Sequence, residues 1–295
     1  MKIGIVGAGA VGMLFGAYLA EAAHDITFLV REKTQQELYI EKESNAAEMI
    51  LCKQVNDFQQ LHSMDLIIIA VKYHHLAQLK VQLDLLPVHI PLLFIQNGLL
   101  HQNFIQQLNQ QTIVLGSVLH GATKINASTV RHLGVGTTSI GVVKGNWELQ
   151  DTFLASASTN FPIEWAANID QLLFRKALLN CLINPLTTIA KVPNGDLIEN
   201  ESYQSIIKNI YEELMGVFEE WKIRLTWDEV TTLCKNTKHN RSSMLNDYEN
   251  GRIMESDTIV GAVLLEADKR NKTLPILQTF YLLLKEMNKV GDQNY

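Results

Sequence analysis

The stretch MKIGIVGAGAVGMLFGAYLAEAAHDITFLV, residues 1–30, decides the fold of the N-terminal half of the chain. Residues 2–6 form a short apolar run that is typical of a buried strand, and a glycine-rich turn and an apolar helical segment follow it. A second apolar run covers residues 26–30. Strand, glycine turn, helix and strand in this order are the context in which a GxGxxG sequence binds a dinucleotide.

Each glycine of the turn GAGAVG has a separate physical reason. Gly7 permits the tight turn, Gly9 lets the backbone approach a pyrophosphate, and Gly12 lets the helix pack closely against the strand. The free N–H groups of the first helical turn would face the phosphates. A purely structural glycine turn is the alternative. The residues predicted to bind the cofactor here are Gly7, Ala8, Gly9, Ala10, Val11 and Gly12.

The end of the second strand indicates which dinucleotide is bound. An NAD site usually has an acidic residue there to bind the ribose 2′-hydroxyl, whereas this strand ends in Val30 and Arg31. Because a guanidinium suits a 2′-phosphate, the sequence favours NADP. The alternative is that Arg31 is an ordinary surface residue and that Glu32 contacts the ribose.

Two further apolar runs deliver polar residues at their C-terminal ends. Residues 66–71 precede Lys72, and residues 91–95 precede Gln96 and Asn97. Ligands of open α/β sheets bind outside the carboxyl ends of the strands, so Lys72 and Asn97 are candidates to touch the cofactor or the substrate. A solvated lysine and a simple Asn-Gly turn are the structural alternatives.

The remaining pattern predicts two domains. Short glycine-containing strands between residues 112 and 143 suggest an antiparallel extension of the sheet, and residues 161–165 suggest an edge strand. From residue 168 onward the pattern is helical, with no alternation of strands and helices. We therefore expect an α/β chain, with an N-terminal Rossmann domain (1–167) that binds the dinucleotide and an all-helical C-terminal domain (168–295).

Composition excludes several classes of function. The net charge is -6 and no Lys/Arg cluster is long enough to track a phosphate backbone, so we expect no nucleic-acid partner. No apolar run is long enough to span a membrane, and no signal peptide is evident. The cysteines Cys52, Cys181 and Cys234 have no metal-binding spacing, which predicts a cytoplasmic protein without a metal site. Monomer and homodimer both remain open.

A polar stripe marks the stretch FRKALLNCLINPLTTIAKVPNG, residues 174–195. Lys176, Asn180 and Asn184 recur every four residues, so on a helix they drift by only about 40° per step. An unpaired polar group on a buried helix would cost roughly 1 to 3 kcal/mol, so the stripe faces internal partners, a polar ligand or, alternatively, solvent. Pro185 predicts that the helix kinks or ends just past Asn184.

The order of motifs over the whole chain resembles the ketopantoate reductase (2-dehydropantoate 2-reductase) family. The motifs are GAGAVG, AVK, IQNG, KxxxNxxxNPLT, PNG, SSMLND and GRxxE. The resemblance implies reduction of a small-molecule 2-keto acid, ketopantoate, to pantoate with NADPH, a step of pantothenate and coenzyme A biosynthesis. It also implies a Rossmann domain that holds the cofactor and a helical domain that closes over it.

The resemblance assigns roles to particular residues. Lys176 would be the general acid and Glu255 would hold the substrate hydroxyl. Lys72 and Asn97 would lie at the junction of cofactor and substrate, and Arg31 would contact the 2′-phosphate. The residues that would bind the substrate or the lysine are Asn97, Asn180, Asn184, Asn194 and Ser243.

The chain departs from the family pattern around Glu255. Met254 stands where threonine is usual, Ser256 replaces isoleucine, Val260 replaces a common asparagine, and Phe174 stands where tryptophan often precedes the lysine. These departures leave the identity of the 2-keto acid open. A reductase of another 2-keto acid and a non-catalytic NADPH-binding regulator are therefore the alternatives.

Overall fold

The computed structural model describes residues 1–31, 37–42 and 47–292 and divides the chain into two compact units. Unit 1 comprises residues 1–96 and 101–170, and unit 2 comprises residues 97–100 and the chain from residue 171 onward. The short segment Asn97–Leu100 therefore belongs to the helical unit, although it follows a strand of the sheet unit directly.

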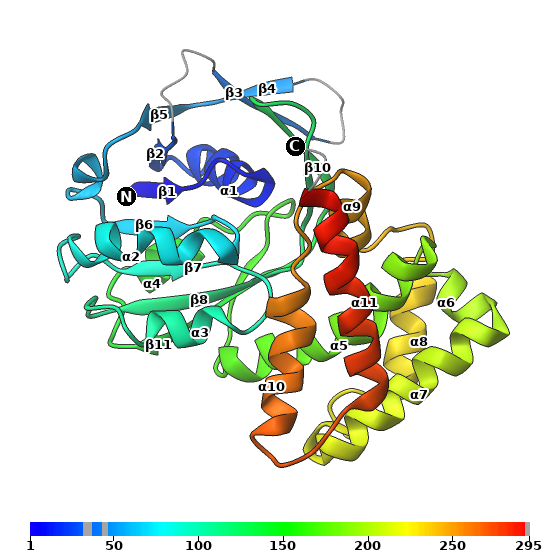
Figure 1. Cartoon of the computed structure of the whole chain (residues 1–295). Coiled ribbons are helices and arrows are strands. Elements are labelled where there is room, and N and C mark those ends of the chain that lie inside the picture. Colours follow the sequence, from blue (N-terminus) through cyan, green and yellow to red (C-terminus); the bar gives the residue numbers. More distant parts are fainter. Residues whose placement is uncertain (32–36, 43–46, 293–295) are drawn as a thin grey trace. The chain divides into compact units, whose positions relative to one another are not determined.

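Unit 1 contains an eight-stranded sheet in the order β12-β11-β8-β7-β6-β1-β2-β5 (Figure 1). Neighbouring strands are parallel except for the pair β8 and β11, which is antiparallel. The central strands are buried on both faces, as expected for a parallel sheet. The strands are β1 (Lys2–Val6), β2 (Asp25–Leu29), β5 (Cys52–Val55), β6 (Leu66–Ile69), β7 (Leu92–Phe94), β8 (Ile113–Val118), β11 (Thr138–Lys144) and β12 (Ile163–Trp165).

The predicted Rossmann arrangement is confirmed in unit 1. The strand–glycine turn–helix–strand order at the start of the chain becomes β1, the loop from Gly7, the helix α1 and β2. The edge strand expected near residue 165 is β12. The helices of unit 1 are α1 (Ala10–Glu21), η1 (Phe58–Leu61), η2 (Tyr73–His75), α2 (Leu76–Asp84), α3 (His101–Ile105) and α4 (Gln150–Leu154).

The antiparallel extension is smaller than the sequence suggested. Only β8 and β11 join the main sheet, whereas the intervening strands lie in a second, four-stranded sheet of order β4-β3-β10-β9. Strand pairing is a long-range property, so local spacing could not reveal that one of these strands, residues 129–134, pairs with residues 38–41. This second sheet consists of β3 (Leu38–Glu41), β4 (Ala47–Ile50), β9 (Gly121–Lys124) and β10 (Thr129–Gly134).

Two histidines, His120 and His132, join the second sheet to α1. The Tyr18 hydroxyl lies 2.8 Å from Nδ1 of His132, and Nε2 of His132 lies 3.3 Å from Nδ1 of His120. The Gly136 N–H also donates to His120 Nδ1, so this nitrogen is an acceptor and His120 is neutral. Burial and the neighbouring His132 lower the pKa of His120 to about 4.

Unit 2 is helical over the residues that the structure describes. Its longest helix, α5, carries the polar stripe, and α11 packs against α7, α9 and the π-helix η4. Figure 1 shows these helices from green to red. The helices are α5 (Ile169–Ala190), α6 (Asp196–Glu199), α7 (Glu201–Val217), η3 (Glu219–Trp221), α8 (Trp227–Asn236), α9 (Ser243–Glu249), η4 (Asp257–Gly261), α10 (Ala262–Asp268) and α11 (Pro275–Asp292).

Of the two outcomes predicted at Pro185, a kink or an end just past Asn184, the end is wrong, because α5 continues through Pro185 to Ala190. Proline removes one backbone donor, which would have reached the carbonyl of Cys181. The Thr187 hydroxyl donates to the Ile183 and Asn184 carbonyls, and the Thr188 hydroxyl donates to the Asn184 carbonyl at 2.6 Å. These additional bonds surround the proline turn with polar contacts, and burial of both threonines keeps the turn packed.

Candidate functional site

The glycine loop in unit 1 has the geometry that a dinucleotide requires. Gly7 has φ +108°, a conformation that favours glycine, and a Cβ there would lie 2.9 Å from Cγ1 of Val71. A Cβ on Gly12 would lie 2.1 Å from the Gly7 carbonyl oxygen. By contrast, a Cβ on Gly9 would meet nothing within 4 Å. The first and third glycines are therefore required by the fold, whereas the second leaves open space in front of the loop.

The helix that follows the loop begins without a side-chain cap. Gly9 is the N-cap residue of α1, and the helix starts at Ala10. Ala10 and Val11 are only partly buried. Uncapped N–H groups in the first turn of a helix are suited to bind an anion.

A cavity of about 610 Å³ lies beside this loop in unit 1. It is lined by Gly7, Ala8 and Gly9 together with Arg31 and Lys72. Both sequence-predicted cations thus line the same cavity as the loop. Glu32, the alternative contact for the ribose, lies outside the described residues.

His75 reports the positive charge of this cavity, which its side chain also lines. Its pKa is lowered, first by burial and then by the positive charges of Arg31 and Lys72. The short helix η2 contains His74 and His75. Nothing in the local pattern indicated that His75 lines the nucleotide cavity.

Sequence reasoning also missed Lys124, at the end of β9. Its ammonium donates a hydrogen bond of 3.0 Å to the carbonyl of Ala8 in the glycine loop, and burial lowers its pKa. Residues 8 and 124 are far apart in the chain, so only the tertiary fold places this cation at the loop.

The polar stripe of α5 belongs to a hydrogen-bonded chain within unit 2. The Lys176 ammonium donates to Oδ1 of Asn97 at 2.9 Å, and Nδ2 of Asn97 donates to Oε2 of Glu255 at 3.0 Å. The orientation of the Asn97 amide is fixed, because an ammonium only donates and a carboxylate only accepts. Asn97 therefore connects Lys176, the predicted general acid, to Glu255, the predicted substrate-binding residue.

Desolvation by burial lowers the pKa of Lys176 to about 8, against the opposing negative charge of Glu255. A lysine with a pKa near 8 releases its proton under neutral conditions far more readily than a solvated lysine does. A strongly shifted lysine beside a specific carboxylate is also the pattern typical of functional sites.

The backbone on either side of Asn97 is held in place. Before it, the Gln96 side chain donates to the carbonyls of Ile69 and Val71 in unit 1, at 2.7 and 3.0 Å. After it, Gly98 has φ +80°, and a Cβ there would lie 2.1 Å from the Thr258 carbonyl oxygen. The same carbonyl accepts the Leu99 N–H at 2.9 Å. Only glycine fits this approach of the segment to η4.

The other asparagines of the stripe are not on a solvated face. Asn180 is partly buried and Asn184 is buried, with Nδ2 of Asn184 having no partner among the described residues. Asn194 is also buried. Its backbone N–H donates to the Asn240 carbonyl and its side-chain Nδ2 donates to the Thr237 hydroxyl, whereas its Oδ1 has no partner among the described residues. Two buried amide atoms are thus left for a polar ligand.

The neighbouring serines differ in their surroundings. Ser243, the predicted substrate residue, is exposed at the start of α9. Ser242 is buried, caps α9 by accepting the Leu245 N–H at 3.1 Å, and accepts the Thr187 hydroxyl of α5 at 2.8 Å. The structure therefore links Ser242 to α5, whereas Ser243 has an exposed side chain.

The residues that depart from the family pattern are packed inside unit 2. Three of them are buried: Met254 directly before Glu255, Ser256 directly after it, and Val260 in η4. Phe174 packs against Phe218 at a ring-centroid distance of 5.1 Å. The departures near Glu255 therefore change the packed surroundings of that carboxylate.

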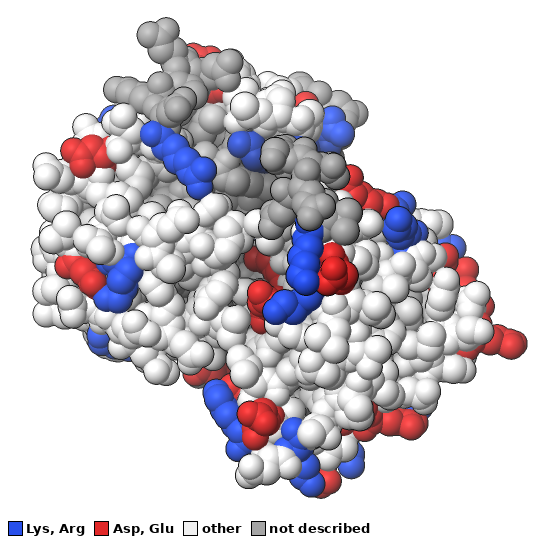
Figure 2. Space-filling view, viewed as in Figure 1, with Lys and Arg blue, Asp and Glu red and all other residues white. Residues whose placement is uncertain are grey.

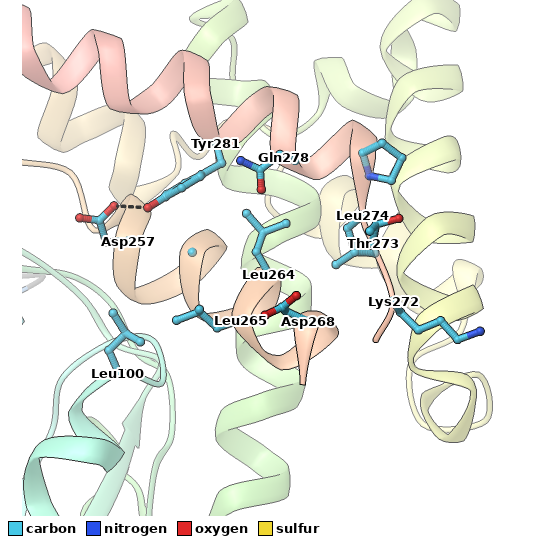
Figure 3. Close-up of a pocket in the computed structure, with 12 residues that line it drawn as sticks. Leu100, Asp257, Leu264, Leu265, Asp268, Lys272, Thr273, Leu274, Gln278 and Tyr281 are labelled. Carbon is cyan, nitrogen blue, oxygen red and sulfur yellow. Dashed lines mark hydrogen bonds between the residues drawn. The ribbon is translucent and has the colours of Figure 1, made fainter. Parts of the chain in front are cut away.

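A second cavity, of about 830 Å³, lies beside η4 and α10 in unit 2 (Figure 3). Leucines line much of it, and the Tyr281 hydroxyl donates to Oδ1 of Asp257 at 2.8 Å across one end. Burial and this carboxylate raise the pKa of Tyr281 to about 12. Neither Lys176 nor Glu255 lines this cavity.

Other kinds of site find no support among the described residues. Within residues 1–31, 37–42 and 47–292, no three His, Cys, Asp or Glu side chains come together as metal ligands. None of the helices in that part of the chain combines the length and apolar character of a membrane span. Figure 2 shows positive and negative side chains intermingled on the visible face.

Both halves of the chain match one known protein family. Residues 3–145 match the family described as "Ketopantoate reductase PanE/ApbA", and residues 168–288 match "Ketopantoate reductase PanE/ApbA C terminal". A 2-dehydropantoate 2-reductase of Listeria innocua is 35% identical over 97% of this chain and 96% of its own. A 2-dehydropantoate 2-reductase of Bacillus subtilis is 29% identical over 98% of both chains.

Solved structures show the same fold. The crystal structure of a probable 2-dehydropantoate 2-reductase from Bacillus subtilis has a TM-score of 0.82, with 29% identity, over 97% of this chain and 100% of that one. A D-mandelate dehydrogenase solved with NADH and anilino(oxo)acetate has a TM-score of 0.85 at 22% identity, over 99% of each chain. With both halves matched in order, the chain belongs to the ketopantoate reductase family of oxidoreductases.

Proposed function

We propose that the protein reduces ketopantoate to pantoate with NADPH and that Lys176 is the general acid. The observation that carries the proposal is the chain from Lys176 through Asn97 to Glu255, together with a lysine pKa near 8. The names of the curated relatives support the same reaction. Pantoate would then feed pantothenate and coenzyme A biosynthesis.

The residues of unit 1 fit a bound NADPH. The open space in front of Gly9 suits a pyrophosphate, and the cations Arg31 and Lys72 line the same cavity. Arg31 would hold the 2′-phosphate, because a guanidinium can form two parallel hydrogen bonds with it. When bound, NADPH supplies the hydride to the carbonyl carbon of the substrate.

Lys176 would act on the carbonyl oxygen of the 2-keto acid. As the carbonyl carbon becomes tetrahedral, negative charge develops on this oxygen, and a positioned ammonium both stabilises the charge and donates the proton. The neutral amine then regains a proton from water. A pKa near 8 keeps Lys176 largely protonated at neutral pH while weakening its hold on the proton.

Glu255 and the asparagines would bind the substrate around Lys176. A carboxylate can accept a hydrogen bond from the hydroxyl of ketopantoate, and the unpaired atoms of Asn184 and Asn194 can pair with polar groups of the acid. An unpaired buried amide costs about 1–3 kcal/mol, so its pairing with substrate favours binding. Asn180 supplies a further amide on the same helix, whereas Ser243 would need to reach the substrate from its exposed position.

The test is NADPH oxidation with ketopantoate by the wild-type protein and by the Lys176→Ala variant. Loss of a general acid typically lowers the rate about 100- to 10,000-fold, so we expect kcat/KM to fall about 1,000-fold. The Kd for NADPH should stay within about twofold, because Lys176 is not among the residues that line the nucleotide cavity. The control is Lys235→Ala, which removes an exposed lysine of α8. Near-normal turnover by Lys176→Ala would refute the mechanism.

A second candidate is a reductase of another 2-keto acid. Buried Met254 and Ser256 next to Glu255 favour it, because they alter the surroundings of the substrate carboxylate. The D-mandelate dehydrogenase of similar fold, solved with NADH and anilino(oxo)acetate, illustrates that fold alone does not choose the acid. A panel of branched and aromatic 2-keto acids, ranked by kcat/KM, separates the two candidates. Tight NADPH binding without turnover across the panel would indicate a regulator.

A further inference from the structure

Asn288 of α11 contacts both neighbours of Glu255. Its Oδ1 accepts the backbone N–H of Met254 at 3.0 Å, and its Nδ2 donates to the Ser256 hydroxyl at 3.2 Å. Met254 and Ser256 are buried, and Asn288 is partly buried. The Asn288 side chain therefore holds both Met254, which precedes Glu255, and Ser256, which follows it.

The chemistry of the two contacts fixes the Asn288 amide. The backbone N–H of Met254 can only donate, so the oxygen of the amide must face it and the NH₂ group must face Ser256. The same amide of Asn288 thus satisfies one backbone group and one hydroxyl in a buried place, where an unpaired group is costly. Alanine at position 288 would leave both without this partner.

The helix that carries Asn288 has a second contact with the same segment. Tyr281 lies seven residues earlier on α11, which places the two side chains two turns apart on one face. Its hydroxyl donates to Asp257 at 2.8 Å (Figure 3). Side chains of α11 therefore bond residues 254, 256 and 257, while the carboxylate of Glu255 accepts from Asn97.

The departures from the family pattern acquire a physical meaning here. An isoleucine at position 256 could not accept a hydrogen bond from the Asn288 amide, whereas the Ser256 hydroxyl does. The residue that differs from the pattern is thus the hydrogen-bond partner of a residue on a distant helix. Ser256 and Asn288 therefore form a hydrogen-bonded pair in this chain.

We infer that Asn288 is a positioning residue, which acts with Ser256 to hold Glu255 in the orientation that binds the 2-keto acid. This inference rests on the proposed function for its effect on turnover. Asn288 does not touch the reacting atoms, and its whole influence passes through Glu255. The prediction that separates this role from general stabilisation is therefore non-additivity with a change at Glu255.

The experiment is a double-mutant cycle on the full-length protein with ketopantoate and NADPH. We expect Asn288→Ala to lower kcat/KM about tenfold, mainly through a higher KM, because a misplaced carboxylate binds substrate less well. Ser256→Ala, a small change in the core, should lower it about threefold. In the Glu255→Gln background, Asn288→Ala should change kcat/KM by less than about twofold. Asn209→Ala, at an exposed position of α7, is the matched control.

A second readout does not depend on turnover. Glu255 raises the pKa of Lys176, so displacement of its carboxylate should lower the pH at which Lys176 becomes reactive. The pH dependence of Lys176 acetylation by acetic anhydride, followed by mass spectrometry, measures this midpoint. It should fall in Asn288→Ala and in Glu255→Gln, with no further fall in the double variant.

The outcomes distinguish the two proposals. An equal loss of kcat/KM on Asn288→Ala in both backgrounds would show a merely structural role and overturn the inference. Unchanged turnover and an unchanged Lys176 midpoint in Asn288→Ala would overturn it as well. If the wild-type protein turns over no 2-keto acid, the proposed function fails, and the acetylation midpoints alone decide whether Asn288 positions Glu255.

Discussion

The glycine loop of unit 1 and the lysine site of unit 2 differ in the groups that they offer to a ligand. The loop offers backbone, since Gly9 has no side chain and a Cβ there would enter empty space. The lysine site offers side chains, and its ammonium, amide and carboxylate are bonded to one another. A backbone site is therefore sensitive to added atoms, whereas a side-chain site is sensitive to lost atoms and to displaced supports.

The two regions also differ in how far along the sequence they are assembled. The loop occupies residues 7–12, all of them consecutive. In the lysine site, Lys176 is 79 residues from Asn97, and Asn97 is 158 residues from Glu255. The first site depends on local conformation, and the second depends on the packing of η4 against the segment that carries Asn97.

The strongest test of this comparison is Gly98→Ala in the lysine site. The added methyl would overlap the Thr258 carbonyl, and the positive φ is strained for alanine, so the segment carrying Asn97 must move. A displacement of about 1 Å near a reaction centre costs about 100-fold, and we expect kcat/KM to fall by that order. The midpoint of thermal unfolding should also fall.

Gly216→Ala is the control for this variant, because a Cβ there meets nothing within 4 Å on exposed α7. Its activity should equal that of the wild-type protein. Normal kcat/KM in Gly98→Ala would show that the lysine site does not need the close approach of Asn97 to η4.

The matching substitution in the loop, Gly9→Ala, should leave the fold intact and weaken cofactor binding. Nothing in the protein meets the new methyl, but a pyrophosphate would. Loss of one or two charge-assisted hydrogen bonds corresponds to about 2 kcal/mol, or a Kd for NADPH raised about 30-fold. Fluorescence titration measures the Kd, and calorimetry measures the unfolding midpoint.

Gly134→Ala is the corresponding control, since its Cβ also meets nothing within 4 Å and it is exposed on β10. Equal NADPH affinity in Gly9→Ala and Gly134→Ala would argue against phosphate binding at the loop.

Arg31→Ala separates the two nicotinamide cofactors. If the guanidinium holds the 2′-phosphate, the Kd for NADPH should rise about tenfold and the Kd for NADH should not change, which corresponds to about 1.4 kcal/mol. Arg131→Ala, an exposed arginine of β10, controls for the general loss of positive charge. An unchanged ratio of the two affinities would remove the assignment of Arg31.

The pH profile gives the smallest and most specific effect. Reduction requires the ammonium form of Lys176, so kcat/KM should be constant below pH 8 and should decrease as pH rises above the pKa of about 8. Because the negative charge of Glu255 raises this pKa, Glu255→Gln should move the decrease to lower pH. Initial rates with ketopantoate between pH 6 and about 10 measure both profiles. A decrease at the same pH in both proteins would separate Glu255 from the titration of Lys176.

The local part of this organisation was predictable from sequence. The strand, the glycine turn and α1 followed from consecutive residues, and the helical character of the C-terminal half followed from periodicity. The pairing of β3 with β10 was not predictable, because it joins residues far apart in the chain. The extension of α5 past Pro185 was missed because the hydroxyl contacts of Thr187 and Thr188 depend on the folded helix.

The site was predictable only in its residue types. The four-residue spacing of Lys176 and the asparagines predicted one polar face, with solvent as an alternative to a ligand, and the resemblance to a family named Glu255. Neither could show that Asn97 lies hydrogen bonded to both Lys176 and Glu255, because three distant segments meet there. Lys124 and Asn288 carried no sequence signal at all, since each acts through a contact with a distant residue.

The assignment of Asn97–Leu100 to unit 2 limits how this protein can be divided or recombined. A fragment that starts at Gln171 contains Lys176 and Glu255 but lacks the amide that joins them. A chimera of two relatives joined after residue 170 would take Asn97 from one parent and its partners from the other. The two halves of the gene are therefore not interchangeable modules, and substitutions around residues 97–100 and 255–258 must be inherited together for the site to keep its geometry.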